Sequence, residues 1–179
     1  VFVDADGTKK SISAPGPGNH ISMAKAVAAA SAVAGKDTVR EKSFVLAHGS
    51  STPQNRVSES QIFDQVAEAF NITEWPVVAV KAYLGHTIAP ASADQLVAAL
   101  GSFKYGILPG IPTIDAVADD VYQDRLKLGP DHLQAAPEDL EVAILNSKGF
   151  GGNNASAVVL SPDRTEAMLR KRHGDEAMA

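Results

Sequence analysis

The chain has 179 residues, enough for one domain with a hydrophobic core, and its 45% apolar and 21% charged residues argue against wholesale disorder. Its formal net charge of −5 is a poor match to nucleic acid, because affinity for nucleic acid comes mainly from neutralising phosphates. No apolar run approaches the roughly 18 residues of a membrane span, and the absence of cysteine excludes disulfides, thiolate zinc sites and a thiol nucleophile within the chain. Because the sequence starts at Val1 and not at Met, and nothing there resembles a signal peptide, we expect a piece of a longer protein.

The N-terminal third is predicted to alternate strands and helices. Residues 1–19 indicate a short strand near residues 1–4 and then a glycine- and proline-rich loop. Residues 20–34 lack Gly and Pro and predict a helix that Gly35 ends, while residues 43–47 form a short apolar run typical of a buried strand. Spacing of three and four residues predicts the buried face of this first helix: Ile21, Ala24, Val27 and Ala28.

Two further helices are predicted in the middle of the chain. Ser58 begins a Ser-x-x-Gln capping box, which predicts a loop over residues 48–57 and a helix that ends near Phe70. A second strand is expected over residues 77–81, and a helix over residues 92–104. The inner faces of these two helices are predicted to be Ile62, Val66, Ala69 and Phe70, and Leu96, Ala99, Leu100 and Phe103.

The C-terminal third is predicted to complete the sheet with an antiparallel pair of strands. Residues 109–130 hold three prolines and an acidic cluster, and we expect mostly loop there. Strands over residues 141–145 and 155–160 are joined by a glycine turn at residues 149–153, which is too short for a crossover connection. A polar helix is expected after Pro162.

These elements indicate an α/β domain with a mixed, open sheet and helices packed on it. We expect three parts: an N-terminal strand and loop over residues 1–19, the domain itself over residues 20–162, and a helical tail over residues 163–179. Sites in such sheets lie at the carboxyl ends of the strands. The groups that follow the predicted strands are His48, Lys81, His86 and the glycine turn.

Three motifs occur in a fixed order along the chain. They are His48-Gly49-Ser50-Ser51-Thr52 with Glu59 beyond it, Lys81-x-x-x-Gly85-His86, and Gly149-Phe150-Gly151-Gly152-x-Asn154. With them, the chain resembles the C-terminal half of the β-ketoacyl synthases, which have a thiolase-like fold. That family carries a His-Gly-Thr-x-Thr segment followed by a Glu, then Lys-x-x-x-Gly-His, then Gly-Phe-Gly-Gly-x-Asn.

The resemblance implies a decarboxylative Claisen condensation of acyl and malonyl groups held on acyl carrier protein, in fatty acid or polyketide synthesis. It implies that His48 and His86 are the two active-site histidines, whose Nε2–H groups stabilise the malonyl enolate as an oxyanion hole does. Lys81 would support them electrostatically, paired with Glu59. The other supporting residues that it implies are Thr52, Phe150 as a gate, and the glycines beside the gate, Gly149, Gly151 and Gly152.

Partners and compartment also follow from the resemblance. It implies acyl- and malonyl-loaded carrier protein, an N-terminal half of the same protein that carries the nucleophilic cysteine, and a homodimer of the whole enzyme in the cytoplasm. No cofactor, metal, nucleic acid or membrane span is expected. The chain by itself is expected to be inactive because it lacks the nucleophile, and to expose the apolar surface that the other half covers.

The sequence departs from the family pattern at several positions. Ser50 replaces a threonine, Arg56 stands where Asp is common, and Lys148 stands where an aromatic residue usually precedes the gate glycine. Residues 87–92 replace a helix start that is normally rich in Gly and Ala. These changes leave open a non-condensing relative, such as a chain-length factor or a scaffold that binds carrier protein. A weaker hypothesis is a separately stable interaction module.

Other chemistries have little support in the sequence. Neither His-x-His nor His-Glu-x-x-His spacing occurs, and a Gly-x-Ser-x-Gly elbow is absent. The glycine turn lacks the Lys-Ser/Thr of a phosphate-binding loop and leads into a strand. His20, His132 and His173 match no motif and are expected to be ordinary surface residues.

Overall fold

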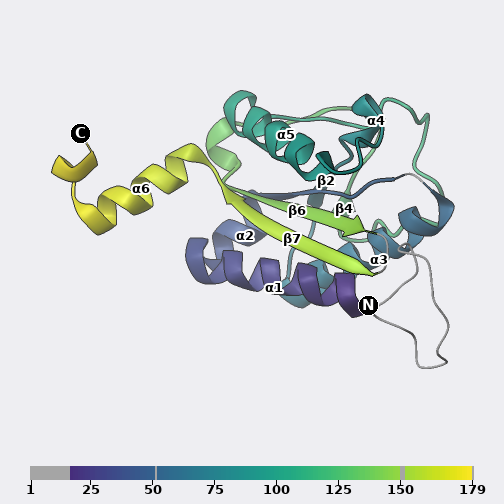
Figure 1. Ribbon diagram of the computed structural model, residues 1–179, viewed down its shortest axis with the longest axis horizontal. Helices are drawn as coiled ribbons and strands as arrows, with labels where there is room; N and C mark the ends of the chain where they lie inside the picture. The colour runs from purple at the N-terminus through teal and green to yellow at the C-terminus, as the bar shows by residue number, and fades with distance from the viewer. Residues whose placement is uncertain (1–16, 51, 150–151, 179) are drawn as a thin grey trace.

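A five-stranded mixed sheet is the centre of the computed structural model, which describes residues 17–50, 52–149 and 152–178 (Figure 1). Its strand order is β4-β2-β1-β6-β7. The first four of these strands run parallel to their neighbours, and β7 is antiparallel to β6, as predicted. The predicted strand near residues 1–4 lies outside the described residues. The strands are β1 (Ser43–Leu46), β2 (Trp75–Val78), β4 (Leu126–Lys127), β6 (Val142–Gly149) and β7 (Asn153–Leu160).

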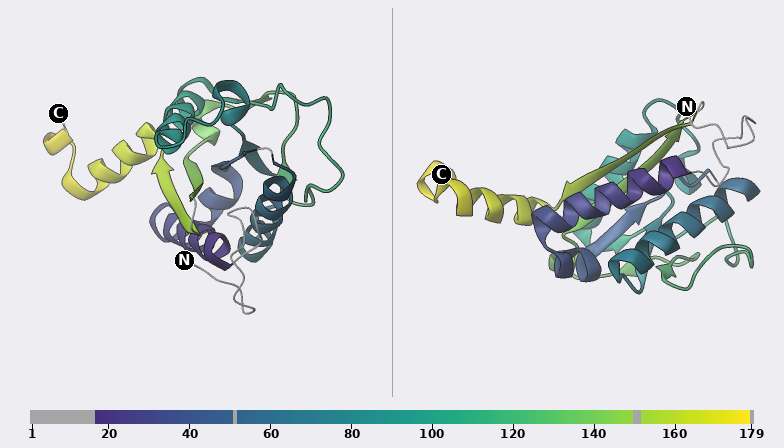
Figure 2. Two further views of the ribbon diagram at one scale, coloured as in Figure 1. Left: turned by 45° about the vertical axis from the view of Figure 1, so that its right-hand side comes forward. Right: turned by 90° about the horizontal axis from the view of Figure 1, so that it is seen from below.

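Helices cover both faces of the sheet, which confirms the predicted layered α/β architecture. One face carries α1 (Pro17–Ala34), α2 (Lys36–Lys42) and α3 (Pro53–Phe70), and the other carries α4 (Lys81–Leu84) and α5 (Ala91–Tyr105) (Figures 1 and 2). None of the helices in the described ranges is long and apolar enough to cross a membrane.

The remaining elements are short or peripheral. A small antiparallel pair, β3 (Ile107–Leu108) and β5 (Leu133–Gln134), flanks a largely irregular segment that contains β4, as expected for this proline-rich region. A 3-10 helix, Pro137–Asp139, precedes β6. The polar C-terminal helix α6 (Pro162–His173) and a last 3-10 turn, Glu176–Met178, extend away from the sheet (Figure 1).

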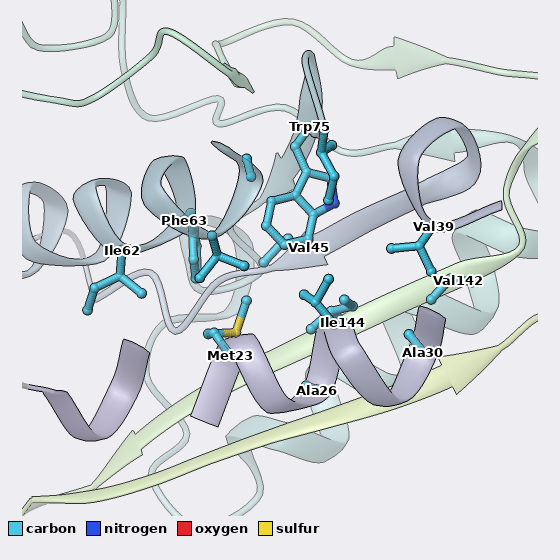
Figure 3. Packing of buried hydrophobic residues seen from close by; sticks show 14 of the residues in the cluster. Met23, Ala26, Ala30, Val39, Val45, Ile62, Phe63, Trp75, Val142 and Ile144 are labelled. Atoms are coloured by element: carbon cyan, nitrogen blue, oxygen red, sulfur yellow. The ribbon is translucent and has the colours of Figure 1, made fainter. Parts of the chain in front are cut away.

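Each face of the sheet has its own apolar core. Successive residues of a strand point to opposite faces, so Val45 and Ile144 pack on the side of α1 and α3 while Phe44 and Leu145 pack on the side of α5. Figure 3 shows the first of these cores. Its labelled members are Met23, Ala26, Ala30, Val39, Val45, Ile62, Phe63, Trp75, Val142 and Ile144.

The buried faces of the helices differ in part from the predicted ones. In α1 the prediction is right for Val27 but wrong for Ile21 and Ala28, which are exposed. In α5 it is right for Ala99 and Phe103 and wrong for two leucines, because this helix is apolar on both sides and only one side meets the sheet. The residues wrongly assigned to inner faces are Ile21, Ala28, Ala69, Leu96 and Leu100.

Several predicted boundaries also need correction. Helix α3 starts at Pro53 and not at Ser58, because Thr52 serves as its N-cap and proline suits the first helical position. Strand β2 begins before Pro76 and ends at Val78, so Lys81 lies in the short helix α4. Helix α2 was not predicted.

Candidate active site

Three parallel strands bring the sequence motifs to one edge of the sheet. Strands β1, β2 and β6 are neighbours and parallel, so their carboxyl ends meet. His48 follows β1, Lys81 follows β2, and Lys148 lies at the end of β6. His86 comes after α4, and its ring meets that of His48 edge to face, with centroids 5.3 Å apart and planes at 80°. The structure therefore assembles both histidines and Lys81 in one place.

His48 is buried and held in one tautomer. Its Nδ1 accepts a hydrogen bond from the backbone N–H of Lys148 at 3.4 Å, so a neutral ring carries its proton on Nε2. Nε2 has no hydrogen-bond partner among the described residues. Burial lowers the pKa of His48 to about 4, and the positive charge of Lys81 acts in the same direction. At neutral pH His48 is thus an uncharged Nε2–H donor.

His86 has the same arrangement on the exposed side of the site. Its Nδ1 accepts from the backbone N–H of Ile88 at 3.0 Å, which again leaves the proton on Nε2. Ile88 has a φ of 67°, a left-handed conformation that is costly for a β-branched residue. This strained backbone turns the N–H toward the imidazole, so the chain fixes the tautomer of His86 at an energetic cost.

Glu59 organises the backbone that leads out of His48. Its Oε1 accepts from the backbone N–H of His48 and from Asn146 Nδ2, at 2.8 and 2.7 Å. Its Oε2 accepts from the backbone N–H of Gly49 and from Asn55 Nδ2, at 2.9 and 2.8 Å. Charge-assisted bonds of this kind are about twice as strong as neutral ones. The buried carboxylate therefore fixes the loop on which His48 sits.

Gly49 is needed in that loop for two reasons. Its φ of 56° lies in the left-handed region that favours glycine. A Cβ at this position would also lie 3.3 Å from the Cβ of Ala79, beyond the end of β2. The close approach of these two strand ends is what brings the groups after β1 and β2 together.

Lys81 is joined to His48 and not to Glu59. Its Nζ donates to the backbone carbonyl of His48 at 2.5 Å, and the ion pairs among the described residues do not include Lys81 with Glu59. Lys81 and Glu59 therefore do not form the expected ion pair. The carboxylate of Glu59, which is already bound to N–H donors, acts on the Lys81 ammonium group only as a nearby negative charge. Partial burial lowers the pKa of Lys81, and the charge of Glu59 opposes that shift.

Asparagine and glutamine side chains complete the site, and the sequence motifs assigned no role to them. Asn146 joins Glu59 to Asn19, which donates to Asn146 Oδ1 at 2.7 Å. Gln95 of α5 donates through Nε2 to the carbonyls of Leu46, Ala47 and Asn146, at 3.3, 2.7 and 3.0 Å. This amide connects α5 to the ends of β1 and β6. Only Asn55, four residues before Glu59 in α3, has a spacing that could have indicated its role.

The remaining predicted site residues have simpler surroundings. Thr52 caps α3, and its hydroxyl accepts from the backbone N–H of Asn55 at 3.3 Å. Gly149 ends β6, and Gly152 has a φ of 79°, which favours glycine in the turn before β7. Phe150 and Gly151 lie outside the described residues. Within the described ranges no group of three His, Asp or Glu residues is placed to hold a metal ion.

Comparisons with known proteins agree with this geometry. The family model for the C-terminal domain of β-ketoacyl synthases matches residues 1–115. The chain is 67% identical over its full length to the β-ketoacyl-[acyl-carrier-protein] synthase FabY of Pseudomonas aeruginosa, of which it spans 28%. The crystal structure of the P. aeruginosa ketosynthase FabY superposes with a TM-score of 0.90 and 66% identity, over 98% of this chain and 27% of that one.

A more distant structure has the same fold. The ishigamide ketosynthase/chain length factor superposes with a TM-score of 0.61 and 26% identity, over 80% of this chain and 33% of that one. The mixed sheet, its helices and the paired histidines define a domain of the thiolase-like ketosynthases. The chain belongs to the β-ketoacyl synthase family and carries the C-terminal domain of that family.

Proposed function

We propose that this chain supplies the histidine pair of a β-ketoacyl-acyl carrier protein synthase that performs decarboxylative Claisen condensation in fatty acid synthesis. One observation carries the proposal: the Nδ1 atoms of His48 and His86 each accept a backbone N–H, so two adjacent rings present Nε2–H donors. Support comes from the similarity to FabY, whose name states acyl carrier protein as its carrier.

The two donors fit the charge that develops during decarboxylation. When malonyl thioester loses carbon dioxide, the electrons of the broken C–C bond move to the thioester oxygen as an enolate. Two fixed N–H donors stabilise that oxygen most in the transition state, because their orientation is set before the reaction. A neutral His48 suits this role, since its lowered pKa of about 4 keeps Nδ1 free to accept from Lys148.

The condensation then needs groups that this chain does not hold. The enolate carbon attacks the carbonyl of an acyl thioester, a new C–C bond forms, and the thiolate of the nucleophile leaves. The chain has no cysteine, so we assign that nucleophile to another part of the protein. Phe150 remains our prediction for the gate beside it, and Thr52 for a supporting contact with substrate.

The exposed apolar side of α4 and α5 supports the proposal that another part of the protein covers this surface. Large apolar side chains are exposed on these helices and on the segment between them, with Val97 of α5 at 70% and Ile88 of the connecting segment at 79% of their surface. We assign this surface to the N-terminal half of the same protein, which would close the site between the two halves. The isolated chain is therefore expected to be inactive.

The complete enzyme is proposed to be a cytoplasmic homodimer that binds acyl and malonyl carrier protein.

A non-condensing relative is the alternative. Arg56 and Lys148 depart from the family pattern, and one structural relative is named as a ketosynthase/chain length factor. A scaffold that makes no bonds has no need for two imidazoles held with free Nε2–H groups, so the geometry favours the condensing enzyme.

The test is replacement of His86 by Ala in the complete protein. Loss of one oxyanion donor is expected to slow release of carbon dioxide from malonyl carrier protein by about 100-fold or more. His173→Ala, on the exposed helix α6, is the matched control and should leave the rate unchanged. Full activity of the His86→Ala protein would overturn the proposal.

A further inference from the structure

Lys148 is a buried lysine beside the histidine pair, and the proposed mechanism uses its backbone N–H but not its side chain. Burial lowers the pKa of its ammonium group, and the charge of Glu59 opposes that shift. Only 6% of the surface of Lys148 is exposed, although it lies near the end of β6. Its Nζ donates to Asn55 Oδ1 at 3.1 Å. Burying an ammonium group costs several kcal/mol unless it is paired and hydrogen-bonded. A buried lysine at this position therefore needs a compensating environment, which the site supplies.

That environment is the carboxylate of Glu59, reached through an amide. Asn55 accepts from Lys148 with Oδ1 and donates to Glu59 with Nδ2 at 2.8 Å, so the amide relays between the cation and the carboxylate. Glu59 in turn accepts from the backbone N–H of His48. The side chain of Lys148 thus ends in the same network that fixes the loop of His48.

The backbone of Lys148 contacts His48 directly. Its N–H donates to His48 Nδ1 at 3.4 Å and therefore opposes a proton on that nitrogen. An imidazolium would place two N–H donors face to face, with the buried ammonium group nearby. A lysine anchored at Asn55 holds this N–H where Nδ1 needs it.

We propose, as an extension of the proposed function, that Lys148 is a positioning residue for His48. Its anchored side chain fixes the end of β6 against α3, and its charge and backbone N–H together keep His48 as the neutral Nε2–H tautomer. The lysine touches neither substrate nor reacting atoms in this account. It acts through His48 alone.

The sign of the electrostatic effect follows from the charged groups around His48. Lys81 from α4, His86 after α4 and Lys148 from β6 lower the pKa of His48, while Glu59 from α3 raises it. Helices α1 and α5 contribute the neutral amides of Asn19 and Gln95. Removing the charge of Lys148 therefore raises the pKa of His48, and the ring becomes protonated at a higher pH.

The experiment compares the complete enzyme with its Lys148→Gln and Lys148→Arg variants. Glutamine can still donate to Asn55 but has no charge, and arginine keeps the charge. The rate of carbon dioxide release from malonyl carrier protein is measured from pH 4 to 8, with Lys171→Gln on the exposed helix α6 as control. For Lys148→Gln we expect the acid limb of the profile to move to higher pH, and for Lys148→Arg we expect it to stay in place.

A second readout does not depend on activity. Nitrogen-15 shifts of His48 in the complete enzyme, labelled at histidine, report its tautomer and its titration midpoint. We expect an Nε2–H ring in the native enzyme and a higher midpoint in Lys148→Gln. An unmoved midpoint and acid limb in a folded Lys148→Gln protein would overturn the inference. An Nδ1–H ring of His48 in the native enzyme would also overturn it, and that measurement needs no variant. A native enzyme without decarboxylase activity would instead contradict the proposed function.

Discussion

At the scale of single residues, Glu59 is the group on which the geometry of the site depends most. It is 4% exposed, and both of its oxygens accept from one backbone N–H and one asparagine amide. A carboxylate bound in this way has no hydrogen-bonding capacity left to spare for a separate ion pair. Its role is to hold the backbone N–H groups of the His48 loop, while Lys81 donates to the backbone carbonyl of His48 in the same loop.

Glu59→Gln tests this role. The glutamine NH₂ group would face N–H donors where the carboxylate has an acceptor, which leaves buried donors unsatisfied. We expect the free energy of unfolding to fall by about 2–3 kcal/mol, measured by urea denaturation followed by circular dichroism. Glu68→Gln is the control, because Glu68 lies in the same helix as Glu59 but is an exposed partner of Arg125. This change should lower the free energy of unfolding by less than about 1 kcal/mol. Equal stability of the two variants would contradict the assignment.

The sequence predicted the charged and imidazole groups of the site but not the amides that connect them. His48, Lys81, Glu59 and His86 lie in motifs whose order is recognisable along the chain. The amide of Asn146 meets Glu59 across 87 positions, and no local pattern encodes such a contact. The resemblance implied Glu59 as the partner of Lys81, whereas in the structure Lys81 donates to the backbone carbonyl of His48.

At the scale of elements, the alternation of strands and helices was predictable, and helix faces and boundaries were less so. Periodicity marks every apolar side of a helix, whether or not the chain itself covers it. Helix α5 shows the difference, because Leu96 and Leu100 belong to an apolar side that remains exposed. The start of α3 was missed because two capping signals occur close together, and the Thr52-Pro53 pair is the one that the helix uses.

Ser43 joins three elements and provides a test at this scale. Its hydroxyl donates to the carbonyl of Val39 in α2 and accepts from the indole Nε1–H of Trp75 in β2, at 2.9 Å in the second case. Trp75 is buried, so Ser43→Ala leaves its N–H unsatisfied. We expect a loss of about 2 kcal/mol in the free energy of unfolding, again from urea denaturation. Ser92→Ala, exposed on α5, should stay within about 0.5 kcal/mol of the parent, and an equally small effect for Ser43→Ala would count against this role.

At the scale of the whole molecule, the proposed function gives this chain one side of a reaction centre. The chain spans 28% of the FabY relative, carries both histidines and contains no cysteine. His86 lies between α4 and α5 in the chain, so a partner seated on their exposed apolar side would enclose the exposed imidazole. Enclosure excludes water, and it would strengthen the N–H donors on which the proposed decarboxylation depends.

The most direct test of this account is the yield of 3-ketoacyl product from acyl and malonyl carrier protein. Three samples are compared: the complete protein, this chain by itself, and the complete protein with both His48 and His86 replaced by Ala. We predict product only from the complete native protein, because the chain lacks the nucleophile and the double variant lacks the enolate donors. Product from the isolated chain, or an undiminished rate in the double variant, would contradict the account.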